Sequence, residues 1–157
     1  MSFKAKIKIR VDSQLIDFTG AKPGGQGGEP PRSRFTDIGE GTVRTREGIV
    51  TVSRKLITGT SFDLSFAKND PGIVTIRRGY ERNGTPMLLV VEEGRRHICL
   101  NSAHGSAIEI TTTCRKLDNR IMTTGKIIIE YAVELHGFRV EKTFMTVDIN
   151  KILTEGN

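Results

Sequence analysis

The chain has 157 residues, of which 36% are hydrophobic and 27% charged, and its formal net charge is +6. This length suits one domain over residues 1–157, and the composition argues against a disordered or membrane-spanning protein. The positive charge permits nonspecific contact with nucleic acid or other anionic surfaces, but it does not specify a partner.

The first segment alternates strictly between apolar and basic residues. Its two faces are Phe3, Ala5, Ile7, Ile9 and Val11 on one side and Lys4, Lys6, Lys8 and Arg10 on the other. This period of two predicts a strand with one buried and one basic face. Because the segment holds no apolar block of the kind found in signal peptides, we expect a cytoplasmic protein without a membrane partner.

The stretch "TGAKPGGQGGEPPRSRF" follows, from Thr19 to Phe35. It contains neither the G-x-x-x-x-G-K-[ST] pattern that holds nucleotide phosphates nor a G-x-G-x-x-G turn leading into a helix. Its Gly and Pro content predicts a flexible connection over about 20–34.

Turn dipeptides further along predict hairpins with defined registers. Glu47-Gly48 places Val43 opposite Val52, and Asn83-Gly84 places Ile76 opposite Val91. The run from Met87 to Val91 is apolar on both faces, so either a homodimer contact or a terminal segment could cover its outer side.

The cysteines and histidines indicate no chemical site. A turn near His104 would pair Cys99 with Ile110, several residues short of Cys114, so we expect two free thiols. His97, His104 and His136 are not spaced as zinc ligands, and we expect no metal and no cofactor.

A hairpin at His136-Gly137 is predicted to place Leu135 opposite Phe138 and Ile129 opposite Phe144. This register turns the phenylalanines toward the apolar face and leaves Met145 and Val147 outside. Basic residues would then lack exposed aromatic partners for stacking on nucleic-acid bases. The last residues, about 150–157, are expected to form a short tail or helical turn.

Together these patterns predict an all-β fold of roughly eight to ten strands, in which successive hairpins close into an antiparallel up-and-down (meander) barrel. The segments "GEGTVRTREGIVTVSRK", "TIRRG", "HGSAIEITTT" and "GKIIIEYAVELHG" resemble the YwiB-like family of uncharacterised bacterial proteins. The resemblance runs from about Ile38 to Ile149 and implies a calycin-type, lipocalin-like barrel. It implies no activity.

Three polar residues are expected on the inner face of that barrel: Arg54, Arg78 and Tyr131. A charge there needs an acceptor, which for Arg54 could be a carboxylate on another strand, an anionic ligand or, at the rim, water. We therefore expect a non-enzymatic barrel that binds a small apolar or anionic molecule in its lumen. The alternative is a protein- or nucleic-acid-interaction module that uses the basic and apolar outer surface. No nucleophile motif is present, since "GTSFD" lacks the second glycine of G-x-S-x-G.

Overall fold

The computed structural model describes residues 1–17, 32–57, 59–79, 86–103, 106–135 and 139–152. It contains ten strands and, in these ranges, no helix. They are β1 (Ser2–Asp17), β2 (Arg32–Arg46), β3 (Ile49–Lys55), β4 (Ser61–Ala67), β5 (Asp70–Gly79), β6 (Pro86–Glu92), β7 (Arg96–Ala103), β8 (Ser106–Arg120), β9 (Lys126–Leu135) and β10 (Arg139–Lys151). All ladders are antiparallel, in the order β6-β5-β4-β3-β2-β1-β10-β9-β8-β7. The predicted all-β meander barrel is confirmed.

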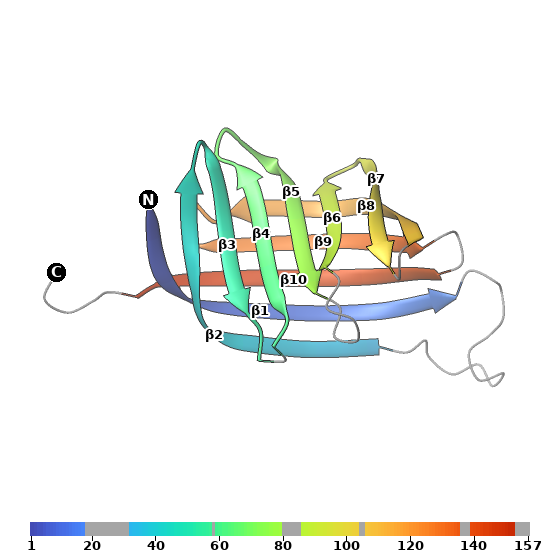
Figure 1. Ribbon diagram of the computed structural model, residues 1–157, viewed down its shortest axis with the longest axis horizontal. Helices are drawn as coiled ribbons and strands as arrows, with labels where there is room; N and C mark the ends of the chain where they lie inside the picture. The colour runs from blue at the N-terminus through green and yellow to red at the C-terminus, as the bar shows by residue number, and fades with distance from the viewer. Residues whose placement is uncertain (18–31, 58, 80–85, 104–105, 136–138, 153–157) are drawn as a thin grey trace, which may run out of the picture.

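The sheet folds over on itself into two layers. The long strands β1, β8, β9 and β10 run across Figure 1, and β3 to β7 cross them in front. β2 belongs to both layers, because it pairs with β1 over Arg32–Arg44 but with β3 only over Thr42–Arg46. The bend in this strand therefore turns the meander from one layer into the other.

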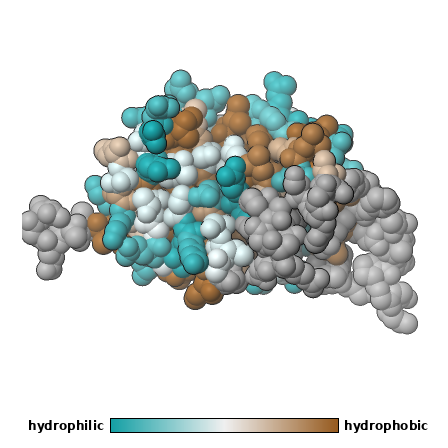
Figure 2. Space-filling model, viewed as in Figure 1, coloured by the Kyte–Doolittle hydropathy of each residue, from teal (hydrophilic) through white to brown (hydrophobic). Residues whose placement is uncertain are grey.

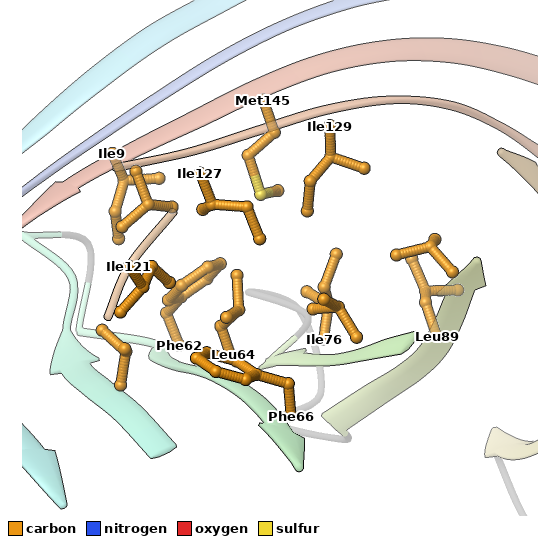
Figure 3. Packing of buried hydrophobic residues seen from close by; sticks show 14 of the residues in the cluster. Ile9, Phe62, Leu64, Phe66, Ile76, Leu89, Ile121, Ile127, Ile129 and Met145 are labelled. Atoms are coloured by element: carbon orange, nitrogen blue, oxygen red, sulfur yellow. The ribbon is translucent and has the colours of Figure 1, made fainter. Parts of the chain in front are cut away.

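The inner faces of the two layers form one aliphatic core. Figure 3 shows Ile9, Ile127, Ile129 and Met145 of the long strands facing Phe62, Leu64, Ile76 and Leu89 of the crossing strands. Each of these eight side chains is at most 2% exposed. Burial of a side chain of this size contributes about 1.5–3 kcal/mol, so this cluster supplies much of the fold's stability.

The barrel closes at a seam between β6 and the strands β7 and β8, where the described residues form no regular ladder. The side chain of Asn101 on β7 exchanges two hydrogen bonds with the backbone of Leu88 on β6. Thr112 on β8 donates to the carbonyl of Val90. Beyond β6, Gly94 N donates to Cys114 O over 2.9 Å. Because side chains satisfy part of the free edge of β6, the sheet is nearly closed without a continuous ladder.

Two of the four predicted hairpin registers hold, those of β2–β3 and β7–β8. Val43 faces Val52 and Cys99 faces Ile110, as expected. Both cysteines are free thiols, which confirms that prediction. Ile76 faces Leu89 and not Val91, so that register was wrong by two residues. An even shift keeps every side chain on its predicted face, and only alternate residues of the run from Met87 to Val91 point inward.

The register of β9 and β10 was wrong by one residue. Leu135 pairs with Arg139 and Ile129 pairs with Met145, because the connection spans three residues, 136–138, and not two. An odd shift reverses the two faces of a strand. Met145 and Val147, which were predicted to lie outside, are therefore fully buried, and Phe144 is 41% exposed.

Two predicted boundaries also need correction. β2 begins at Arg32, so the connection predicted over 20–34 ends earlier, and its residues 20–31 lie outside the described ranges. β10 continues to Lys151, because its last residues pair with β1, so the tail or helical turn predicted over about 150–157 starts later, and its residues 153–157 lie outside the described ranges. The part of the chain that the structure describes has no helix long and apolar enough to cross a bilayer. Over the crossing strands, Figure 2 shows hydrophobic atoms gathered where Figure 1 places β5 to β7.

Candidate functional site

The barrel interior changes from apolar to polar along its length. On β1 the inward row runs from Ile7 and Ile9 to Ser13, and on β10 it runs from Val147 and Met145 to Thr143. Tyr131 continues the row of Ile127 and Ile129 on β9. The aliphatic core therefore fills one end of the barrel, and hydroxyl groups face the interior at the other end.

Four inward residues form one row across the long strands: Ser13, Thr143, Tyr131 and Cys114. Ser13 Oγ lies 3.2 Å from Thr143 Oγ1, and Thr143 is hydrogen-bonded to the side chain of Tyr131. Tyr131 is 5% exposed and Cys114 2% exposed. The row is thus a buried chain of hydroxyl groups that ends in a thiol.

Arg78 and Glu141 place opposite charges close to this row. Arg78 lies two residues after Ile76 on the inner face of β5. Glu141 lies two residues before Thr143 on the inner face of β10. Burial raises the pKa of Tyr131 to about 12, with Arg78 acting to lower it and Glu141 to raise it. At neutral pH the phenol therefore stays protonated and can donate a hydrogen bond, but it is not a base.

Arg54, by contrast, is bound within the protein. Its Nε pairs with Asp37 Oδ1, and its Nη1 donates to the carbonyl of Glu40 over 2.9 Å. Asp37 Oδ2 also accepts the backbone N–H of Ile57 over 2.8 Å. Both side chains are nearly buried, with 9% and 5% of their areas exposed. Of the three acceptors considered for Arg54, the structure shows a carboxylate on another strand, that of Asp37. Asp37 lies where β2 bends away from β3.

The three predicted site residues therefore separate into two groups. Arg78 and Tyr131 lie close enough for the charge of Arg78 to act on the phenol. Arg54 is in the same cross-strand row as Arg78, with Phe62 between them, but its guanidinium is turned toward Asp37. Ser13 was not predicted as a site residue, although its alternation with Val11 indicates the inner face. Glu141 and Thr143 were not predicted because the one-residue register error placed them on the outer face.

His97, the histidine within the described ranges, has a carboxylate partner nearby in the chain. His97 Nε2 lies 3.0 Å from Glu92 Oε1, across the turn between β6 and β7. Within the described ranges no group of three or more His, Cys, Asp or Glu residues could hold a metal ion. His104 and His136 lie outside those ranges.

Comparison with known proteins finds a similar fold. The crystal structure of the ywiB protein from Bacillus subtilis superposes on this chain with a TM-score of 0.57, covering 92% of each chain at 16% sequence identity. The two proteins share a fold. No protein-family model matches the chain, and no curated protein matches it. The likeness therefore supports the barrel architecture and assigns no activity.

Proposed function

We propose that this protein is a calycin-like barrel of the YwiB type that binds a small molecule at the polar end of its interior. The ligand carries an anionic group, which Arg78 binds, next to an apolar portion. The shared fold with the Bacillus subtilis protein supports the barrel type, and the site itself rests on this chain's own residues.

The observation that carries the proposal is the state of Arg78. It is partly buried on the inner face, and among the described residues no carboxylate forms an ion pair with it. A guanidinium withdrawn from water gains most from a charged acceptor, and its planar fork fits a carboxylate, sulfonate or phosphate. Arg54, which has such an acceptor in Asp37, shows how this barrel satisfies an arginine internally.

The surrounding groups define the rest of the ligand. The hydroxyl of Tyr131, protonated at neutral pH, offers a hydrogen bond beside the cation. Ile108, Val133 and Leu135 are half-buried and pack against the aliphatic core near the ends of their strands. An amphipathic anion would place its charged group on Arg78 and its apolar part against these side chains.

The test is a comparison of Arg78→Met with Arg77→Met. Arg77 is the neighbouring residue on β5 but is exposed on the outer face, so its substitution removes the same charge without altering the interior. Native mass spectrometry of freshly purified protein detects a co-purifying small molecule, and titration with 1-anilinonaphthalene-8-sulfonate measures binding of an apolar anion.

We expect wild type and Arg77→Met to retain the small molecule and bind the dye, and Arg78→Met to lose the first and weaken the second at least tenfold. A loss of one charge-assisted hydrogen bond of about 1.5–3 kcal/mol sets this scale. Equal binding by the two variants, with both folded by circular dichroism, contradicts the proposal.

A further inference from the structure

The outer face of the long strands carries an exposed aromatic ring among basic residues. Phe144 on β10 is 41% exposed and lies between Asp12 on β1 and Glu130 on β9. Arg10 is diagonal to it on β1, and Lys142 precedes it by two residues on the same face. The direct cross-strand neighbours of the ring are therefore carboxylates, and the cations lie diagonal to it or two residues away. An exposed ring on an open sheet face with cations nearby has the elements of a stacking platform for nucleic-acid bases.

The surface beside the ring is recessed. A groove of about 330 Å³ crosses this face, with Phe144, Lys142 and Arg115 among its lining residues. Ala132 also lines the groove, between Thr113 on β8 and Lys142 on β10. Because alanine is small between longer neighbours, the sheet face has room here for a flat group next to the ring.

The charged residues that line the groove are three cations, Arg32, Arg115 and Lys142, and two carboxylates, Asp12 and Glu130, so they leave a small net positive charge. Arg32 and Arg34 lie 3.4 and 3.2 Å from Asp12, so this carboxylate is balanced by two cations. Within the described part of the chain, Lys142 and Arg115 take part in no ion pair. The outward residues of β1 extend the positive charge away from the groove: Lys4, Lys6, Lys8 and Arg10.

From this arrangement we infer that the outer face of β1, β8, β9 and β10 binds single-stranded nucleic acid. One base stacks on Phe144, and Lys142, Arg115 and Arg10 contact phosphates on either side. A single strand is required because its bases are free to leave the stack and lie on the ring. The recess suits a slender polyanion better than a flat anionic bilayer, and this surface is separate from the interior site of Arg78.

The stacking step is tested at position 144 with two substitutions of different character. Fluorescence anisotropy measures binding of a labelled oligodeoxythymidine of about twelve nucleotides, a length within the range that single-strand sites cover. We expect Phe144→Leu, which stays apolar but cannot stack, to weaken binding at least about fivefold, and Phe144→Tyr to remain near wild type. Leu100→Ala, at a residue 72% exposed on β7, is the control and should not change binding.

The phosphate contacts are tested through salt dependence. Lys142→Gln should weaken binding and reduce the slope of log affinity against log salt by roughly 0.7, while Arg96→Gln, at an exposed position on β7, should leave it unchanged. Absence of oligonucleotide binding by the wild type, equal binding by Phe144→Leu and Phe144→Tyr, or binding to phosphatidylglycerol vesicles in place of the oligonucleotide overturns the inference. Arg78→Met should bind the oligonucleotide normally, so this inference and the proposed interior site fail independently.

Discussion

The side-chain amide of Asn101 pairs with the backbone of Leu88 as a neighbouring strand would. Its Nδ2 donates to Leu88 O over 3.1 Å, and its Oδ1 accepts from Leu88 N over 2.7 Å. Leu88 lies on β6, an edge strand of the continuous sheet. An exposed strand edge invites pairing with other chains, so one amide that occupies both backbone groups protects the seam of the barrel.

Replacement of Asn101 by leucine should loosen this seam. The substitution keeps the size of the side chain but leaves two backbone groups of Leu88 without their partners, at a cost of about 1–3 kcal/mol. We expect a lower midpoint of urea unfolding and faster hydrogen exchange at the Leu88 amide. Asn150→Leu, at an exposed position on β10, serves as the control and should change neither. Unchanged exchange at Leu88 in Asn101→Leu would contradict this account of the seam.

The ion pair of Arg54 and Asp37 is expected to stabilise the bend of β2. Arg54→Met leaves Asp37 buried with a net charge, which costs about 3–5 kcal/mol in comparable buried pairs. The double variant Arg54→Met with Asp37→Leu removes that charge and should recover most of the loss in the free energy of unfolding. Lys4→Met breaks an exposed pair with Glu40 and should cost about 0–1 kcal/mol. Additive losses in the double variant would show that the two side chains do not depend on each other.

Gly39 leaves room for the guanidinium of Arg54. A Cβ at this position would lie 2.5 Å from both Nη atoms, closer than carbon and nitrogen can approach. Gly39→Ala should therefore displace Arg54 from Asp37 and cost about 1–3 kcal/mol by overpacking. Gly72→Ala is matched to it, because the added carbon there meets its nearest atom, Asp70 Oδ1, at 3.9 Å. Thermal unfolding of the two variants compares them, and equal melting temperatures would mean that Arg54 moves aside freely.

The raised pKa of Tyr131 makes stability depend on pH in alkaline solution. Its pKa is about 12 in the folded protein, against an ordinary value of 10.0 for tyrosine, chiefly because burial disfavours the phenolate. Between these values the unfolded chain releases a proton that the folded protein retains, so stability is complete below pH 10 and falls toward pH 12. The slope is at most about 1.4 kcal/mol per pH unit.

Urea unfolding at pH 9 to 12 should show this loss in wild type and a smaller one in Tyr131→Phe. The chain has two tyrosines, so absorbance at 295 nm in Tyr80→Phe follows the ionisation of Tyr131 alone. A titration midpoint near 10 would place the phenol in contact with water and remove the hydroxyl row from the interior.

Much of the fold can be predicted from local patterns. The alternation of Ile7, Ile9 and Val11 with basic residues fixes which side chains share a face of β1, because a strand has a period of two. The β2–β3 register also follows from the sequence, since Glu47 and Gly48 adopt φ values of 52° and 77° and form a two-residue turn. Arg78 and Tyr131 were placed on the inner face for the same reason.

Only the tertiary structure decided the other features. The β9–β10 register depends on a three-residue connection, and that single extra residue moved Phe144 to the outer face and Met145 to the core. The partner of Arg54 lies on a strand 17 positions away and is brought to it by the bend of β2. Periodicity determines which residues lie together on a strand face, whereas loop length and long-range pairing determine which face turns inward and what each buried charge meets.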